Sequence, residues 1–128
     1  GFYSSTSKIR TLNGNLGAKL DLIWTNPNPS SNISTKTIQL GTNYTYYIIE
    51  TSKQFAGGLG CRAMITYGES LGMSVAGSSN TSKVCRDIQL NSSGQLTIKQ
   101  GWGQSQYGSS EYPDWLLPQR IYGVKASK

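Results

Sequence analysis

The chain has 128 residues, a formal net charge of +6 and no histidine. The missing histidine excludes Ser-His-Asp and Cys-His triads and histidine metal sites, and two cysteines are too few for a four-ligand zinc site. Only 14% of the residues are charged, and the basic ones are spread along the chain without a cluster, so the charge does not indicate nucleic-acid binding. We therefore expect no metal, no cofactor and no nucleic-acid partner.

The N-terminal residues 1–17 are polar and contain glycine. We expect a linker or a cloning remnant there, with one possible short strand near Lys8–Leu12. Residues 18–128 are expected to form a single domain, since about 110 residues suffice for one hydrophobic core. No apolar run approaches the roughly 20 residues that a membrane span needs, so no membrane insertion is expected.

Three consecutive strands are predicted between Leu20 and Glu50. Apolar and polar residues alternate over Leu20–Trp24 and Lys36–Leu40, and Tyr44–Glu50 is a run of β-forming residues. The loop at residues 26–32 contains two prolines among asparagines and serines, which places it at the surface. Trp24 is expected in the core, because its ring is large enough to dominate one face of a sheet.

Further strands are predicted in the second half of the chain. The glycine-containing segments 57–60, 77–80 and 91–94 are expected to be loops or turns between them. No window shows helical periodicity over three turns, so the sequence predicts an all-β fold, an antiparallel, jelly-roll-like β-sandwich of about eight or nine strands. The expected strands are Cys61–Tyr67, Leu71–Val75, Lys83–Leu90, Gln95–Gln100 and Gln119–Val124.

Three residues in these strands raise structural questions. Arg86 falls on the more apolar face of its strand, and we favour a side chain that snorkels at the sheet edge over one paired with a buried carboxylate. Cys61 and Cys85 form either one disulfide or two buried thiols. A disulfide would favour an extracellular protein and free thiols one assembled in a reducing cytoplasm.

The candidate binding site is the segment 101–114, GWGQSQYGSSEYPD, which shows no periodicity and is expected to be a long loop. Aromatic rings stack on the apolar face of a pyranose, and side-chain amides bond its hydroxyls. The expected ligand-binding residues are therefore Trp102, Tyr107, Glu111 and Tyr112, with Tyr107 foremost. Alternatively, these aromatics cover one end of the sandwich or face a neighbouring subunit. Trp115, flanked by two leucines, is expected in the core or an interface.

Several motifs carry a family resemblance. They are LIWTNPNPSS at Leu22–Ser31, TIQL at Thr37–Leu40 before a tyrosine-rich strand, the strand and turn Arg86–Gly94, and IYGVK at Ile121–Lys125. Together they resemble the C-terminal receptor-binding domain of bacteriophage tail fibre and tail tip proteins. The chain departs from that pattern at Ile33, where an aromatic residue is common, and in its two cysteines.

The resemblance implies a non-catalytic tip domain on a virion. Such a domain binds a host cell-surface glycan or protein during adsorption and assembles as a homotrimer. One alternative is a bacterial surface adhesin or pilin-like subunit, which an oxidised Cys61–Cys85 bridge would support. A second alternative is a glycan-cleaving domain in which Glu111 and Asp114 flank the glycosidic bond, although we do not expect an enzyme.

Overall fold

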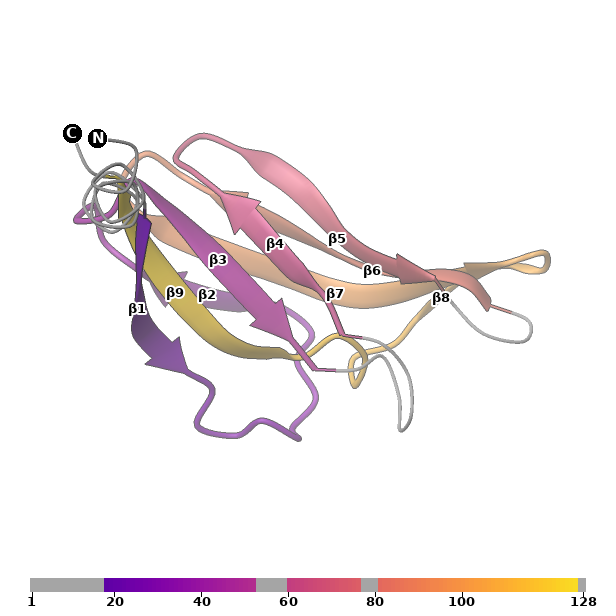
Figure 1. The fold of residues 1–128 in the computed structure, drawn as a ribbon. Helices are drawn as coiled ribbons and strands as arrows, with labels where there is room; N and C mark the ends of the chain where they lie inside the picture. Colours follow the sequence, from indigo (N-terminus) through magenta and orange to yellow (C-terminus); the bar gives the residue numbers. More distant parts are fainter. Residues whose placement is uncertain (1–17, 53–59, 77–80, 127–128) are drawn as a thin grey trace, which may run out of the picture.

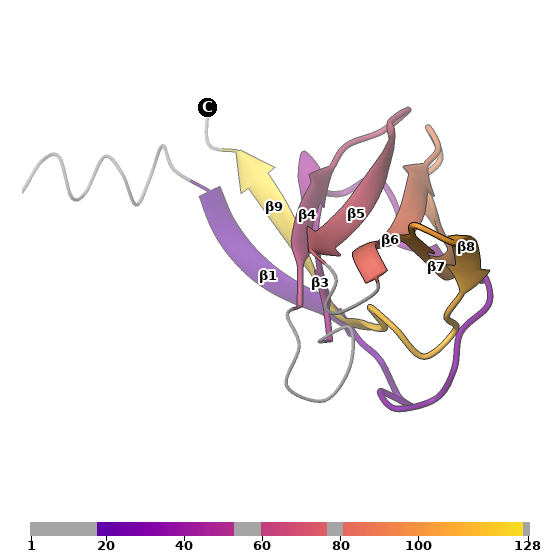
Figure 2. The ribbon, with the colours of Figure 1, turned by 90° about the vertical axis from the view of Figure 1, so that its right-hand side faces the viewer.

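The computed structural model describes residues 18–52, 60–76 and 81–126, which form nine strands and no helix. The strands make two antiparallel sheets that pack face to face, one in the order β1-β9-β3-β4 and the other in the order β2-β7-β6-β5, with β8 beside β7 (Figure 1). Figure 2 shows the layers from the end, with β1 and β9 on one side and β6, β7 and β8 on the other. The predicted all-β sandwich is confirmed.

The strand bounds agree closely with the alternation in the sequence, apart from the segment after Gln100. The expected strand near Lys8–Leu12, the turn at residues 77–80 and residues 57–59 of the glycine cluster lie outside the described residues. The observed strands are β1 (Ala18–Thr25), β2 (Lys36–Gln39), β3 (Tyr46–Thr51), β4 (Arg62–Ile65), β5 (Ser70–Ala76), β6 (Thr81–Leu90), β7 (Gln95–Ser105), β8 (Gly108–Glu111) and β9 (Pro118–Ala126).

The core lies between the two sheets and consists of the inner faces of the strands, except for β8, which is exposed along its whole length. The four-stranded sheet contributes Tyr47, Ile49 and Ile121, and the five-stranded sheet contributes isoleucines and leucines of β6 and β7, all almost fully buried. Each fully buried side chain of this size stabilises the fold by roughly 1.5–3 kcal/mol. The remaining cluster residues are Ile38, Ile65, Met73, Ile88, Leu90, Leu96 and Ile98.

A β-bulge in β1 changes the face on which its apolar residues lie. Leu22 pairs with Tyr122 but Trp24 pairs with Ile121, so Ile23 is an extra residue in this strand. Trp24 thereby reaches the inner face and packs against the core, where it stays half-buried instead of fully buried. Leu20 and Leu22 lie on the opposite face with 48% and 55% of their surface exposed.

The loop between β1 and β2 is exposed from residue 27 to residue 32, as expected for a proline-rich turn. Asn26, which begins it, is buried. Its Nδ2 donates to the Pro118 carbonyl at 2.8 Å, and its Oδ1 accepts a hydrogen bond from the Asn28 amide at 2.8 Å. Asn26 therefore joins the end of β1 to the start of β9.

The expectation that Arg86 snorkels at a sheet edge was wrong, and so was the alternative of a carboxylate partner. Arg86 is fully buried. Its guanidinium donates hydrogen bonds at 2.8–2.9 Å to the main-chain carbonyls of Trp115, Ile33, Lys99 and Pro113. Burial lowers the pKa of Arg86 to about 10, and the nearby Asp114 charge opposes this shift. The side chain stays charged at neutral pH and holds two loops against β7.

Neither cysteine is in a disulfide; Cys61 is half-buried and Cys85 is buried. Burial and the neighbouring Asp87 raise the pKa of the Cys85 thiol to about 11. The thiol is therefore protonated at neutral pH and is a weak nucleophile.

Among the described residues, no helix has the length and apolar character that a bilayer crossing requires.

Candidate functional site

The segment 101–114, expected to be a loop, is largely a β-hairpin. β7 continues to Ser105, and β8 returns antiparallel to it with Ser105 paired to Gly108. The two-residue turn is Gln106-Tyr107, and Gly108 follows with φ +118°, a conformation that favours glycine. The Ser105 hydroxyl oxygen accepts a hydrogen bond from the Tyr107 amide at 3.1 Å. The hairpin projects from the end of the sandwich opposite the paired start of β1 and end of β9 (Figure 1).

Tyr107 stands at the tip of this hairpin. With 81% of its surface exposed, it is the most exposed large hydrophobic residue in the described part of the chain. Its backbone is held by the Ser105 side chain, while its ring extends into solvent. A fixed backbone under an exposed ring reduces the entropy lost when a ligand binds the ring.

Trp102 lies on the outer face of the five-stranded sheet, away from the core. It pairs with Cys85 on one side and with Glu111 on the other, and directly paired residues share a face. Lys83 places its ammonium 5.1 Å from the centre of the Trp102 ring, within the range of a cation–π interaction. The hairpin therefore brings together Trp102 and Glu111, two of the four predicted site residues, and adds Lys83.

Tyr112 does not join this group. Its ring stacks on that of Trp115 with 3.8 Å between centroids and 6° between planes. The Tyr112 amide donates to the Gly101 carbonyl at 2.7 Å, and the Tyr112 carbonyl accepts from the Trp115 amide at 3.2 Å. Tyr112 thus packs on Trp115, whose carbonyl accepts a hydrogen bond from the Arg86 side chain. This agrees with the alternative that some of these aromatic residues cover one end of the sandwich. Trp115 itself is half-buried.

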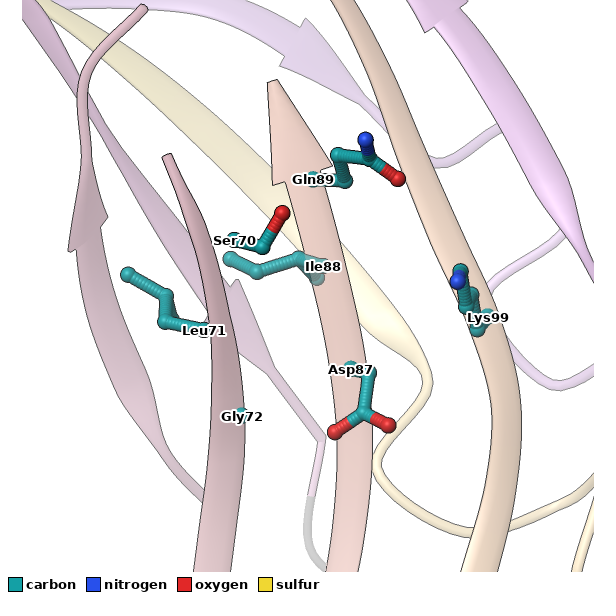
Figure 3. A pocket seen from close by; sticks show the side chains of 7 residues that line it. All are labelled: Ser70, Leu71, Gly72, Asp87, Ile88, Gln89 and Lys99. Atoms are coloured by element: carbon teal, nitrogen blue, oxygen red, sulfur yellow. The ribbon is translucent and has the colours of Figure 1, made fainter. Parts of the chain in front are cut away.

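A shallow hollow of about 340 Å³ lies on the same outer face. Three neighbouring strands line it with the polar side chains of Ser70, Asp87, Gln89 and Lys99, together with Leu71, Gly72 and Ile88 (Figure 3). Gly72 leaves room there, because a Cβ at this position would lie 3.2 Å from both the Asp87 Oδ1 and the Cys85 Sγ. Sequence reasoning missed this hollow, because it depends on which strands are neighbours in the sheet.

The outer face of the five-stranded sheet thus carries the carboxylate of Asp87, the amide of Gln89 and the amines of Lys83 and Lys99, with Gly72 in the hollow. The Trp102 ring lies on the same face, farther along the sheet. Asp87 and Trp102 both adjoin Cys85, which pairs with Trp102 and whose thiol donates to the Asp87 Oδ1 at 3.7 Å. This combination suits a polyhydroxylated ligand, which needs hydrogen-bond donors and acceptors beside a flat apolar surface.

The two acidic residues considered for catalysis have different surroundings. Glu111 is exposed opposite Trp102 on β8. Asp114 follows in the next turn, and its charge acts on Arg86. No group of three or more Cys, Asp or Glu residues that could hold a metal ion occurs within residues 18–52, 60–76 and 81–126.

Comparison with protein families, characterised proteins and solved structures finds no match to this chain. Its function therefore has to be argued from the geometry of its own residues.

Proposed function

We propose that this domain is a non-catalytic recognition module that binds a host cell-surface glycan, as the receptor-binding tip of a bacteriophage tail fibre does. The observation that carries the proposal is the projecting hairpin of β7 and β8, with Tyr107 exposed at its tip and Trp102 on its outer face.

The position of the hairpin supports a role in recognition. The chain enters β1 and leaves β9 at one end of the sandwich, where Ala18 pairs with Ala126, and the hairpin lies at the other end (Figure 1). A domain attached to a fibre through the residues before β1 would thus present the hairpin at its far end. Distal placement is what a tip domain requires.

The chemistry of the outer face supports a sugar as the ligand. Trp102 offers an aromatic ring with the ammonium of Lys83 over it at 5.1 Å from its centre and Glu111 across the strand pair. The adjoining hollow adds Asp87 and Lys99. Stacking of one pyranose ring on Trp102 would place its hydroxyls among these charged groups, each able to donate or accept hydrogen bonds.

A glycan array of bacterial surface polysaccharides, probed with the fluorescently labelled 128-residue chain, tests the proposal. Trp102→Ala and Tyr107→Ala should each lower the bound signal by about tenfold or more, the loss typical of aromatic residues at the centre of a binding site. Lys125→Ala, which shortens a long exposed side chain at the opposite end of the sandwich, is the matched control and should bind normally.

Three results would contradict the proposal. Binding unaffected by both aromatic substitutions would remove the hairpin from the site. Release of reducing ends during incubation, lost in Glu111→Gln, would instead indicate a glycan-cleaving enzyme. Binding to intact cells that survives periodate oxidation of their glycans would identify a protein receptor.

A further inference from the structure

The outer face of the four-stranded sheet is unusually apolar for a solvent-exposed surface. Of the four exposed large hydrophobic residues in the described ranges, three lie here, namely Leu20, Leu22 and Met64, with 48%, 55% and 62% of their surface exposed. In the register of the sheet, Ile48 lies between Tyr122 and Met64 on the same face. A contiguous apolar surface of this kind marks an interaction site more often than a bare surface.

This face is not flat. A hollow of about 500 Å³ lies at the β4 side of the face, lined by Thr45, Tyr46, Met64, Thr66 and Glu69. Met64 itself is unbranched and flexible, a side chain that fits well into irregular apolar gaps. The face thus carries both a protruding side chain and an adjacent depression.

The charges at the two ends of β4 are opposite in sign. At one end Arg62 and Arg120 flank Glu50, with Nε–O distances of 2.8 and 2.6 Å, and their side chains remain 65% and 52% exposed. At the other end Glu69 is exposed, and its carboxylate accepts a hydrogen bond from the Thr66 amide at 2.7 Å. Two arginines and one glutamate leave the first end positive, whereas Glu69 makes the second negative.

We propose that this face binds a second copy of the same chain, related by a two-fold axis beside Met64, in place of the homotrimer that the family resemblance implies. A two-fold axis there places Met64 of each copy at the hollow of the other. It also sets the exposed Arg62 of each copy opposite Glu69 of the other, because Arg62 begins β4 and Glu69 lies in the turn after it, on the other side of Met64. A two-fold contact must be self-complementary, and this face is self-complementary in shape, polarity and charge.

Sedimentation equilibrium of the full chain at micromolar concentration tests the contact. The wild type should sediment as a dimer, and Met64→Glu should raise the dissociation constant by about 30-fold or more. Ser109→Glu, which adds the same charge on exposed β8 of the other sheet, should leave it unchanged. A monomeric wild type, with residues 1–17 or another protein covering the face, would overturn the proposal. So would a trimer, or a dimer insensitive to Met64→Glu.

A charge exchange tests the two-fold geometry separately from folding. Arg62→Glu and Glu69→Arg should each weaken self-association, because each variant faces its own copy with like charges. An equimolar mixture should form a heterodimer more tightly than either variant associates with itself, since opposite charges then meet at both ends. Two variants that stay monomeric when mixed, although each unfolds cooperatively like the wild type, would overturn the arrangement.

Discussion

The guanidinium of Arg86 is fully buried against the main-chain carbonyl of Trp115, with 2.8 Å between Nε and O. The same guanidinium also bonds the carbonyls of Ile33 and Pro113. One β6 side chain therefore fixes two loops that are distant in sequence, and one of them leads out of the candidate binding hairpin. The hairpin is anchored at its base and exposed at its tip.

The first prediction concerns this anchor. Arg86→Met should lower the free energy of unfolding by about 3–5 kcal/mol, because it removes four charge-assisted hydrogen bonds to main-chain carbonyls. The Pro113 carbonyl keeps a hydrogen bond from the Ile33 amide at 2.9 Å. Urea denaturation at pH 7 measures the loss. Lys99→Met, a charge removal on the exposed face of β7, is the control and should stay within about 0.5 kcal/mol of wild type. A loss below about 1 kcal/mol for Arg86→Met would mean that the loops hold their positions without the guanidinium.

The sequence predicted the strands wherever one face of a strand is buried. In β6, Ile88 and Leu90 alternate with exposed residues, and the turn that follows has Gly94 at φ +81°, as its Asn-Ser-Ser-Gly sequence indicates. Arg86 was also assigned to the correct face. Its partners were not predictable, because they are main-chain carbonyls contributed by residues up to 53 positions away.

The hairpin of the candidate site escaped prediction for a different reason. Beyond Gln100, the buried positions of β7 are Gly101 and Gly103, which have no side chain, so the sequence shows no alternation of apolar and polar residues there. The pairing of Trp102 with Glu111 then follows from a two-residue turn that only the register reveals. The bulge at Ile23 in β1 was likewise not predictable from the sequence pattern. One inserted residue moves every later side chain to the other face, so Trp24 does not share a face with Leu20 and Leu22.

The half-buried position of Trp24 changes the effect expected of its removal. A fully buried tryptophan would lose about 3–5 kcal/mol on replacement by alanine, whereas Trp24→Ala should lose about 2–3 kcal/mol because part of the ring already faces solvent. Thermal unfolding checks this, with Ser109→Ala on the exposed β8 as a control expected within about 0.5 kcal/mol of wild type. A Trp24→Ala loss as small as that of Ser109→Ala would place Trp24 outside the core.

The pH dependence of stability should report on Glu50. Burial tends to raise the pKa of this carboxyl, but hydrogen bonds from Arg120 and Arg62 outweigh burial and hold the pKa below its ordinary value of 4.5. Ionised Glu50 therefore stabilises the fold above pH 4.5, and this contribution is lost as the pH falls through the lower folded-state pKa. Urea midpoints at pH 7 and pH 3 should differ less in Glu50→Gln than in wild type. Equal differences in the two proteins would show that Glu50 contributes nothing to the acid sensitivity.

Two glycine-to-alanine substitutions should separate a rigid contact from a yielding one. A Cβ at Gly101 would collide with the main-chain carbonyl oxygen of Tyr112 and lie 3.1 Å from that of Trp115. Because main chain held by Arg86 cannot move aside, Gly101→Ala should lose about 2 kcal/mol or more of unfolding free energy. Gly72→Ala meets only the ends of the Asp87 and Cys85 side chains, at 3.2 Å.

These two side chains can shift by a few tenths of an ångström, so Gly72→Ala should lose no more than about 1 kcal/mol. Urea denaturation compares the two variants, and amide hydrogen exchange should show faster opening at Tyr112 in Gly101→Ala alone, since its amide bonds the Gly101 carbonyl. Equal losses in the two variants, with unchanged exchange at Tyr112, would show that the base of the hairpin yields as easily as the surface hollow. The hairpin would then lack the rigid support that positions Trp102 and Tyr107 for binding.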